Sequence, residues 1–156
     1  MSNNIPTELV AKLADAYNPL LLCIAIVIAL YFLVSRKEFY GLRLVASAIV
    51  VYGLMFLDNL SGVWPSVGLD YSTHTATSLA MCVFIATAFL GWTIAILLFA
   101  SLLVYAQAMV MLGYHSWADI LSTAGVVLIC LSPIYAKKWR KPTSNHNELV
   151  FADKLK

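Results

Sequence analysis

Charged side chains are scarce in this sequence, and long stretches contain none. Asp, Glu, Lys and Arg make up 12% of the 156 residues, while apolar residues make up 62%. A soluble domain of this size cannot shield so much apolar surface from water, so the ordinary soluble classes are excluded. The basic-aromatic pattern typical of nucleic-acid binding is also missing, and no nucleic-acid partner is predicted. The composition indicates a polytopic membrane protein.

Cysteine and histidine are equally sparse, with three residues of each. All three cysteines lie within apolar stretches, and no CxxC pair occurs. Such cysteines are typical of small buried apolar positions rather than of thiol-based metal or redox sites. We therefore predict neither a metal nor a cofactor.

Long apolar runs dominate the chain. One of them, 76–112, is too long for a single crossing of about 20 residues, so we divide it at Gly91. The first run lacks the basic start and cleavage site of a signal peptide, and we expect it to remain in the mature protein. The sequence predicts an all-α membrane bundle over residues 1–136, followed by a polar tail at 137–156. Its five expected spans cover residues 20–34, 41–57, 75–90, 93–112 and 117–135.

Lysine and arginine are distributed unevenly around these spans. They gather in segments 36–43 and 137–141, whereas 58–75 and 113–116 contain none. Because cytoplasmic loops carry the excess of basic residues, this bias predicts an N-terminus outside and a C-terminus in the cytosol. His146, in the tail, is then a solvated residue without an assigned role.

Two of the three histidines begin predicted spans on the extracytoplasmic side. His74 lies at the start of the third span, and His115 lies with Asp119 at the start of the fifth. The i, i+4 spacing of the second pair predicts that both side chains share one helical face. Two imidazoles and a carboxylate suit covalent catalysis, with one imidazole as nucleophile and the other as acid. We predict His115, His74 and Asp119 as catalytic residues.

Structural interpretations compete with this one. Ser116 and Asp119 have the spacing of a capping box, and Ser72 is placed to cap the third span. A histidine beside interfacial tyrosine and tryptophan can belong to the aromatic belt alone. Capping and catalysis are compatible, because a capped helix start still offers N–H groups to an anion.

These residues resemble the type 2 phosphatidic acid phosphatase superfamily, whose motifs are KxxxxxxRP, PSGH and SRxxxxxHxxxD. YSTH at 71–74 stands in place of PSGH, and GYHSWAD at 113–119 matches the end of the third motif. The resemblance covers about residues 45–135. It implies an enzyme acting on a membrane lipid phosphoester, with His115 forming a phosphohistidine, Asp119 steadying it and His74 protonating the leaving alcohol. Expected substrate-binding residues are Ser72, Thr73, Asp70 and Asp58.

The sequence also departs from this family. Ala108 and Met109 replace the Ser-Arg pair of the third motif, and the basic first motif is missing from loop 58–75. Sphingomyelin synthase-like enzymes are similar in keeping His, His and Asp without that arginine, and His74-Thr75 matches their histidine-threonine pair. Such enzymes transfer a phospho-headgroup between lipids. The sequence therefore leaves both hydrolysis and transfer as possible reactions. We expect the protein in a bacterial inner membrane, with the site facing the extracytoplasmic side.

Two further alternatives remain. One is a non-catalytic membrane protein that binds a lipid or a partner on a degenerate phosphatase scaffold, which the loss of basic ligands favours. The other is a metal-dependent membrane hydrolase in which His74, His115 and Asp119 hold a metal-bound water, with Asp58 or Asp70 as a further ligand.

Overall fold

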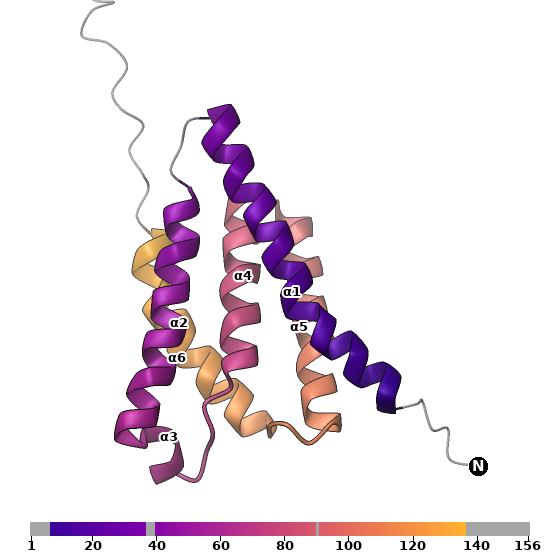
Figure 1. Ribbon diagram of the computed structural model, residues 1–156, viewed down its shortest axis with the longest axis vertical. Coiled ribbons are helices and arrows are strands. Elements are labelled where there is room, and N and C mark those ends of the chain that lie inside the picture. The colour runs from indigo at the N-terminus through magenta and orange to yellow at the C-terminus, as the bar shows by residue number, and fades with distance from the viewer. Residues whose placement is uncertain (1–6, 37–39, 90, 137–156) are drawn as a thin grey trace, which may run out of the picture.

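The computed structural model describes residues 7–36, 40–89 and 91–136, which form helices and short connections without a strand (Figure 1). The tail at 137–156 and Lys37 lie outside the described residues. The first helix ends in a π-helical turn, Phe32–Arg36. The helices are α1 (Thr7–Tyr31), α2 (Gly41–Ser61), α3 (Val63–Ser66), α4 (Thr73–Phe89), α5 (Trp92–Met111) and α6 (Trp117–Ala136).

Four of these helices are long and apolar enough to cross a membrane by length and composition. They are α2, α5, α6 and the first helix with its π-helical turn. The apolar helix α4 has 17 residues, at the lower limit for a crossing. The chain is therefore an integral membrane protein built as a polytopic helical bundle.

The helix boundaries lie within four residues of the expected spans except at the start of the chain, and the largest of these differences is at α2, which continues to Ser61. The expected division of the long apolar run is confirmed, because α4 ends at Phe89 and α5 begins at Trp92. The first helix begins at Thr7 rather than at residue 20, and Pro19 lies inside it. A single proline removes one helical N–H, and helices in membranes tolerate this. The short helix α3 was not expected.

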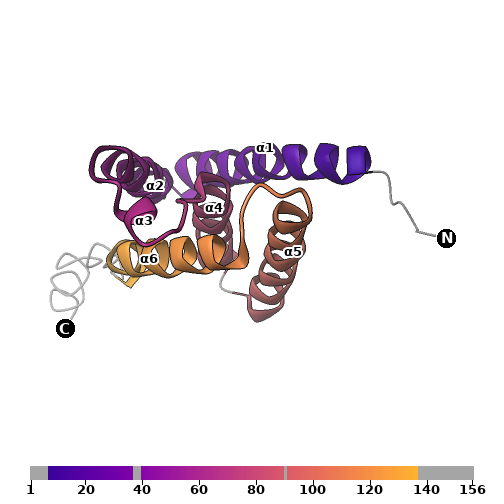
Figure 2. The same ribbon diagram turned by 90° about the horizontal axis from the view of Figure 1, so that it is seen from below.

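Helix α4 occupies the centre of the bundle. It packs against α1, α2, α5 and α6, which surround it in the view along the bundle (Figure 2). Small buried residues such as Ala76, Ser78 and Ala80 let neighbouring helices approach it closely. Farther along, the fully buried Phe84 packs with Ala25 of α1. Because α4 touches every other long helix, its first residue is fixed relative to all of them.

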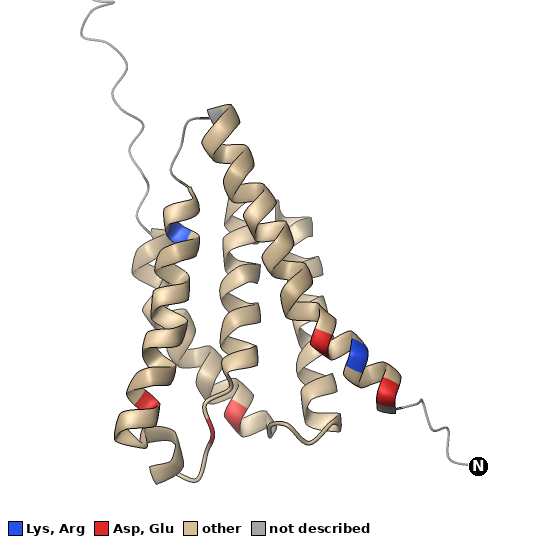
Figure 3. Cartoon of the chain, viewed as in Figure 1, with Lys and Arg blue, Asp and Glu red and all other residues tan. Residues whose placement is uncertain are grey.

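The helices alternate in direction, so one end of the bundle collects the starts of α1, α4 and α6 and the ends of α2 and α5 (Figure 1). We call this end the histidine end. All described acidic residues lie toward it, whereas Arg43, at the start of α2, lies at the opposite end (Figure 3). Lys12 is the described basic residue on the acidic side, and it forms an ion pair with Glu8 at 2.7 Å.

Candidate functional site

His74 is the second residue of α4, and a serine cap fixes where that helix begins. The backbone N–H of Thr75 donates to Oγ of Ser72 at 3.3 Å, so Ser72 is the N-cap. The carbonyl oxygen of His74 accepts hydrogen bonds from Oγ of Ser78 and from Nδ2 of Asn18. The imidazole itself is exposed. The backbone of His74 is thus held while its ring is free to meet a ligand.

His115 precedes α6 instead of lying on it. Gly113 adopts a left-handed φ of 73° after the end of α5 and turns the chain, and α6 begins only at Trp117. The expected helical i, i+4 pairing of His115 with Asp119 is therefore wrong, because His115 lies before the helix. Its side chain is 10% exposed, and its Nδ1 is buried without a hydrogen bond.

Two hydrogen bonds join the loop before α4 to the first turns of α6. The N–H of Asp70 donates to Oδ1 of Asp119 at 2.8 Å, and the N–H of Ser72 donates to Oγ1 of Thr123 at 3.1 Å. Asp70 and Ser72 are thus two residues apart in the loop, and their partners, Asp119 and Thr123, are four residues apart on one face of α6. This clamp brings Asp70 to His115, with Oδ2 of Asp70 lying 3.4 Å from Nδ1.

Asp119 is occupied by this clamp and by a capping box. Its Oδ2 accepts from the N–H of Ser116 at 2.8 Å and from Oγ of Ser116 at 2.7 Å, while its own N–H donates to Oγ of Ser116. The expected capping box is confirmed. No described hydrogen bond joins Asp119 to His115, although the two lie close enough to interact electrostatically. The carboxylate that contacts the imidazole is that of Asp70, at 3.4 Å from Nδ1.

The structure brings His74 and His115 together across α4 and the α5–α6 loop. Their ring centroids are 6.5 Å apart, with 53° between the ring planes. At this separation both rings can contact one phosphate group. The two imidazoles and Asp70 form the candidate site, and Asp119 supports it through the backbone of Asp70.

Two of the expected substrate-binding residues are engaged elsewhere. Ser72 is fully buried, and its Oγ donates to Thr75 Oγ1 at 2.8 Å. Asp58 is buried, and its Oδ1 accepts from the N–H of Trp64 at 2.9 Å, which stabilises the turn from α2 to α3. Beside this turn, burial raises the pKa of Tyr71 to about 12, so its hydroxyl stays protonated and donates to the carbonyl oxygen of Val51.

Thr73 and His74 line a cavity of about 320 Å³ between α1, α2 and α4. Asn18 also lines it, although the sequence interpretation left this residue outside the first span. Its Nδ2 donates to Tyr105 Oη at 3.3 Å, and its Oδ1 is buried without a hydrogen bond. An amide inside an apolar membrane helix was the available signal, because polar groups at membrane depth face protein or water-filled cavities.

Within the described ranges, no three His, Cys, Asp or Glu side chains gather in a way that could hold a metal ion. The described residues therefore supply no set of metal ligands for the metal-hydrolase alternative. In comparisons with known proteins, no family, curated protein or solved structure matches the chain.

Proposed function

We propose that this chain is a membrane enzyme that cleaves or transfers a lipid phosphoester through a phosphohistidine on His115. One observation carries the proposal. Two imidazoles from separate segments lie 6.5 Å apart at one end of a membrane bundle, and a carboxylate lies 3.4 Å from Nδ1 of the more buried one. That combination is suited to nucleophilic catalysis in which the nucleophile, the acid and an orienting group are distinct.

In the proposed reaction, Asp70 holds the proton of His115 on Nδ1, so that Nε2 presents its lone pair to phosphorus. The separation of 3.4 Å shortens when substrate binds, as hydrogen bonds in catalytic sites commonly do. The Nε2–P bond forms while the bond from phosphorus to the leaving oxygen breaks. His74 gives that oxygen a proton. Water or the hydroxyl of a second lipid then attacks phosphorus, its proton passes to His74, and the Nε2–P bond breaks to release His115.

The charges at the histidine end favour a substrate with little negative charge. Asp58 near the end of α2, Asp70 before α4 and Asp119 in the first turn of α6 all lie there, and Lys12 is already paired with Glu8. A phosphomonoester dianion needs charged donors to offset its repulsion from these acids, whereas a diester carries one negative charge. We therefore infer that the substrate is a lipid phosphodiester.

We also infer that the histidine end faces the extracytoplasmic side of a bacterial inner membrane. The basic segments 36–43 and 137–141 adjoin the ends of α1 and α6, and those ends lie opposite the histidines. Basic segments remain cytoplasmic during insertion, which supports this orientation.

The proposal is tested by replacing the nucleophile. The purified chain in lipid vesicles is given a panel of phosphodiester and phosphomonoester lipids, and release of headgroup or phosphate is measured. His115→Ala should reduce turnover to background, and the acid-labile phosphohistidine expected in wild type should be missing. Tyr114→Ala, an exposed neighbour in the same loop, is the matched control and should retain activity. Equal turnover by wild type and His115→Ala would contradict the mechanism.

A non-catalytic binding protein is the second candidate. The acidic residues around the histidines and the engagement of Asp119 in a capping box favour it. Orthovanadate separates the two functions, because it resembles the phosphoryl transition state. An enzyme should show a higher melting temperature with vanadate, and His115→Ala should abolish the increase. No turnover and no increase in wild type would favour the binding protein.

A further inference from the structure

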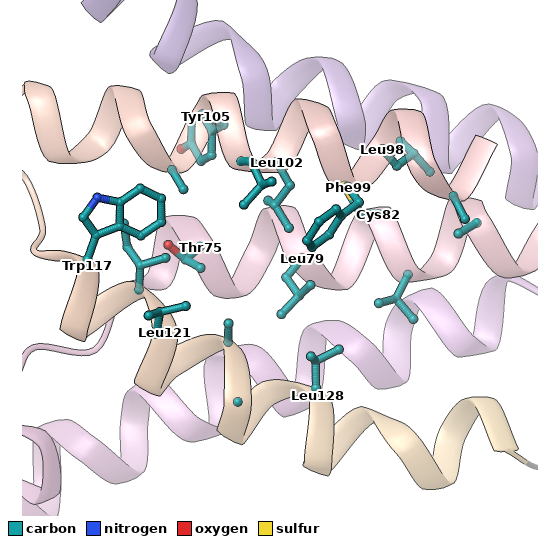
Figure 4. A pocket seen from close by; sticks show the side chains of 18 residues that line it. Thr75, Leu79, Cys82, Leu98, Phe99, Leu102, Tyr105, Trp117, Leu121 and Leu128 are labelled. Atoms are coloured by element: carbon teal, nitrogen blue, oxygen red, sulfur yellow. The ribbon is translucent and has the colours of Figure 1, made fainter. Parts of the chain in front are cut away.

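Polar side chains from three helices meet in the cavity beside His74. It has a volume of about 320 Å³, and its polar lining residues are Asn18 of α1, Tyr52 of α2 and Thr73, His74 and Thr77 of α4. No aspartate, glutamate, lysine or arginine is among the residues that line it. The groove that α4 forms with α5 and α6 differs, because its lining is mostly leucine and other apolar side chains (Figure 4). Polar groups around a cavity in a membrane bundle indicate a polar occupant.

The hydroxyl groups of Thr73 and Thr77 are available to a ligand. Many serines and threonines in the described helices donate to a carbonyl oxygen one turn earlier, as Ser47 and Ser78 do. Thr73 and Thr77 lie one turn apart on one face of α4, and neither hydroxyl has a hydrogen-bond partner among the described residues. The hydroxyl of Tyr52, whose side chain is exposed, likewise has no partner there. Three hydroxyl groups from two helices are thus free at this cavity.

Asn18 adds an unused acceptor on the α1 side. Its Nδ2 donates to the carbonyl oxygen of His74 and to Oη of Tyr105, whereas its Oδ1 is buried without a hydrogen bond. Threonine and tyrosine hydroxyls both donate and accept, and an amide oxygen only accepts. A ligand that carries hydroxyl groups can pair with each of these types, because its own hydroxyls also donate and accept. An acyl chain or an apolar helix face would leave the polar groups unpaired, which is costly in a membrane.

Depth and charge narrow the choice of occupant further. Thr73 is the first residue of α4, so the cavity lies at the histidine end, at the level of lipid head groups. A quaternary ammonium head group is recognised by a cage of aromatic rings, and Tyr52 is the one tyrosine, tryptophan or phenylalanine that lines this cavity. The volume is near the lower end of the ~300–1,000 Å³ typical of small-molecule sites, which suits a short polyol. We propose that this cavity binds a neutral, hydroxyl-bearing head group of a lipid phosphodiester.

The part of this head group in the reaction rests on the proposed function, and it determines which bond of the diester breaks. His74 lines the cavity and His115 does not. Because the attacking and leaving groups lie in line on opposite sides of phosphorus, a phosphate between the imidazoles directs its leaving oxygen past His74 into the cavity. The Nε2–P bond of His115 forms as the bond from phosphorus to the head-group oxygen breaks, and that oxygen takes the proton of His74. The diacylglyceryl phosphate stays on His115 until water or a second alcohol attacks phosphorus and gives its proton to His74.

Two lipids of equal charge test the head-group site. Phosphatidylglycerol and phosphatidylpropanol each carry one negative charge, and they differ by the hydroxyl groups of the glycerol head group. Dissociation constants are measured by native mass spectrometry on the full His115→Ala chain, which lacks the proposed nucleophile, so that no lipid is consumed. We expect phosphatidylglycerol to bind at least about tenfold more tightly. Adding Thr77→Val should reduce this ratio to less than about threefold, because valine keeps the shape of threonine but lacks its hydroxyl.

Thr93→Val is the matched control, because Thr93 is exposed near the start of α5, does not line the cavity and should leave the ratio unchanged. Thr77→Ser keeps a hydroxyl and should retain most of the preference, and circular dichroism checks that each variant folds. Equal binding of the two lipids, or an unchanged ratio in folded Thr77→Val, overturns the head-group site. With the wild-type chain and phosphatidylglycerol, release of glycerol supports the assigned bond, and release of diacylglycerol overturns it. A preference for phosphatidylglycerol without any turnover removes only the enzyme proposal.

Discussion

Helices α4 and α6 begin with the same local motif but hold their histidines in different surroundings. Each has a serine N-cap, Ser72 or Ser116, whose Oγ accepts the N–H three residues later. His74 follows its cap and lies exposed in the first turn, whereas His115 precedes its cap and is 10% exposed. The two histidines thus differ both in their position relative to the cap and in their burial.

This difference assigns the two imidazoles different roles in the proposed mechanism. The confined ring of His115 faces the carboxylate of Asp70, as expected of a nucleophile held in one tautomer. The exposed ring of His74 can exchange protons with water after each turnover, as expected of a general acid. Substitutions of the imidazoles, of the nearby carboxylates and of the caps should therefore have distinct effects.

After loss of the nucleophile, replacement of the exposed imidazole should have the largest effect. His74→Asn should reduce turnover of alkyl phosphodiester lipids by about 10²–10⁴-fold, because the leaving alkoxide loses its proton donor. A p-nitrophenyl phosphodiester should restore most of the rate, since p-nitrophenolate leaves without a proton. His115→Ala should gain nothing from this substrate. Rescue of both variants, or of neither, would remove the assignment of distinct roles.

The two carboxylates near His115 should separate activity from stability. Asp70→Asn should lower turnover by ~10²-fold, less than the ≈10⁴-fold seen for a buried triad aspartate, because the Asp70 side chain is 68% exposed. Its melting temperature should stay close to that of wild type, since exposed ion pairs contribute little to stability. Turnover and melting curves are measured on the same samples.

Asp119→Ala should show the converse pattern. It removes the acceptor for three hydrogen bonds, from Asp70 and Ser116, and should lower the free energy of unfolding by about 1–3 kcal/mol. Turnover should decrease only to the extent that loss of the hydrogen bond to its N–H lets Asp70 move away from His115. A greater loss of turnover in Asp119→Ala than in Asp70→Asn, at unchanged stability, would identify Asp119 as the orienting carboxylate instead.

The caps should give the smallest effects. Ser72→Ala and Ser116→Ala should each lower the free energy of unfolding by about 1 kcal/mol, measured by reversible unfolding in mixed micelles. We expect Ser72→Ala to cost more, because Ser72 is fully buried and its Oγ also bonds Thr75. Ser66→Ala, at an exposed site on α3, is the control and should stay within about 0.5 kcal/mol of wild type. Equal values for all three variants would show that the caps are energetically unimportant.

Local patterns in the sequence predict the helices and their caps well. The apolar run 76–112 required a break, and the break lies at Gly91 because that residue precedes the first helical position of α5. The spacing of Ser116 and Asp119 predicts a capping box because both partners belong to one helical turn. The early start of α1 was missed because its first residues are polar and amphipathic, so hydropathy alone does not include them.

The sequence alone determined that this chain enters a membrane, where most of its helices lie and which histidines gather at one end. Each of these features depends on residues close together along the chain. Only the tertiary structure decided that Asp70 rather than Asp119 faces His115, that Asn18 supports His74, and that α4, α5 and α6 enclose a groove. These features join residues about 45 or more positions apart, or depend on how three helices diverge. The packing of the helices determines these long-range contacts and the space between helices, and no local pattern of residues encodes that packing.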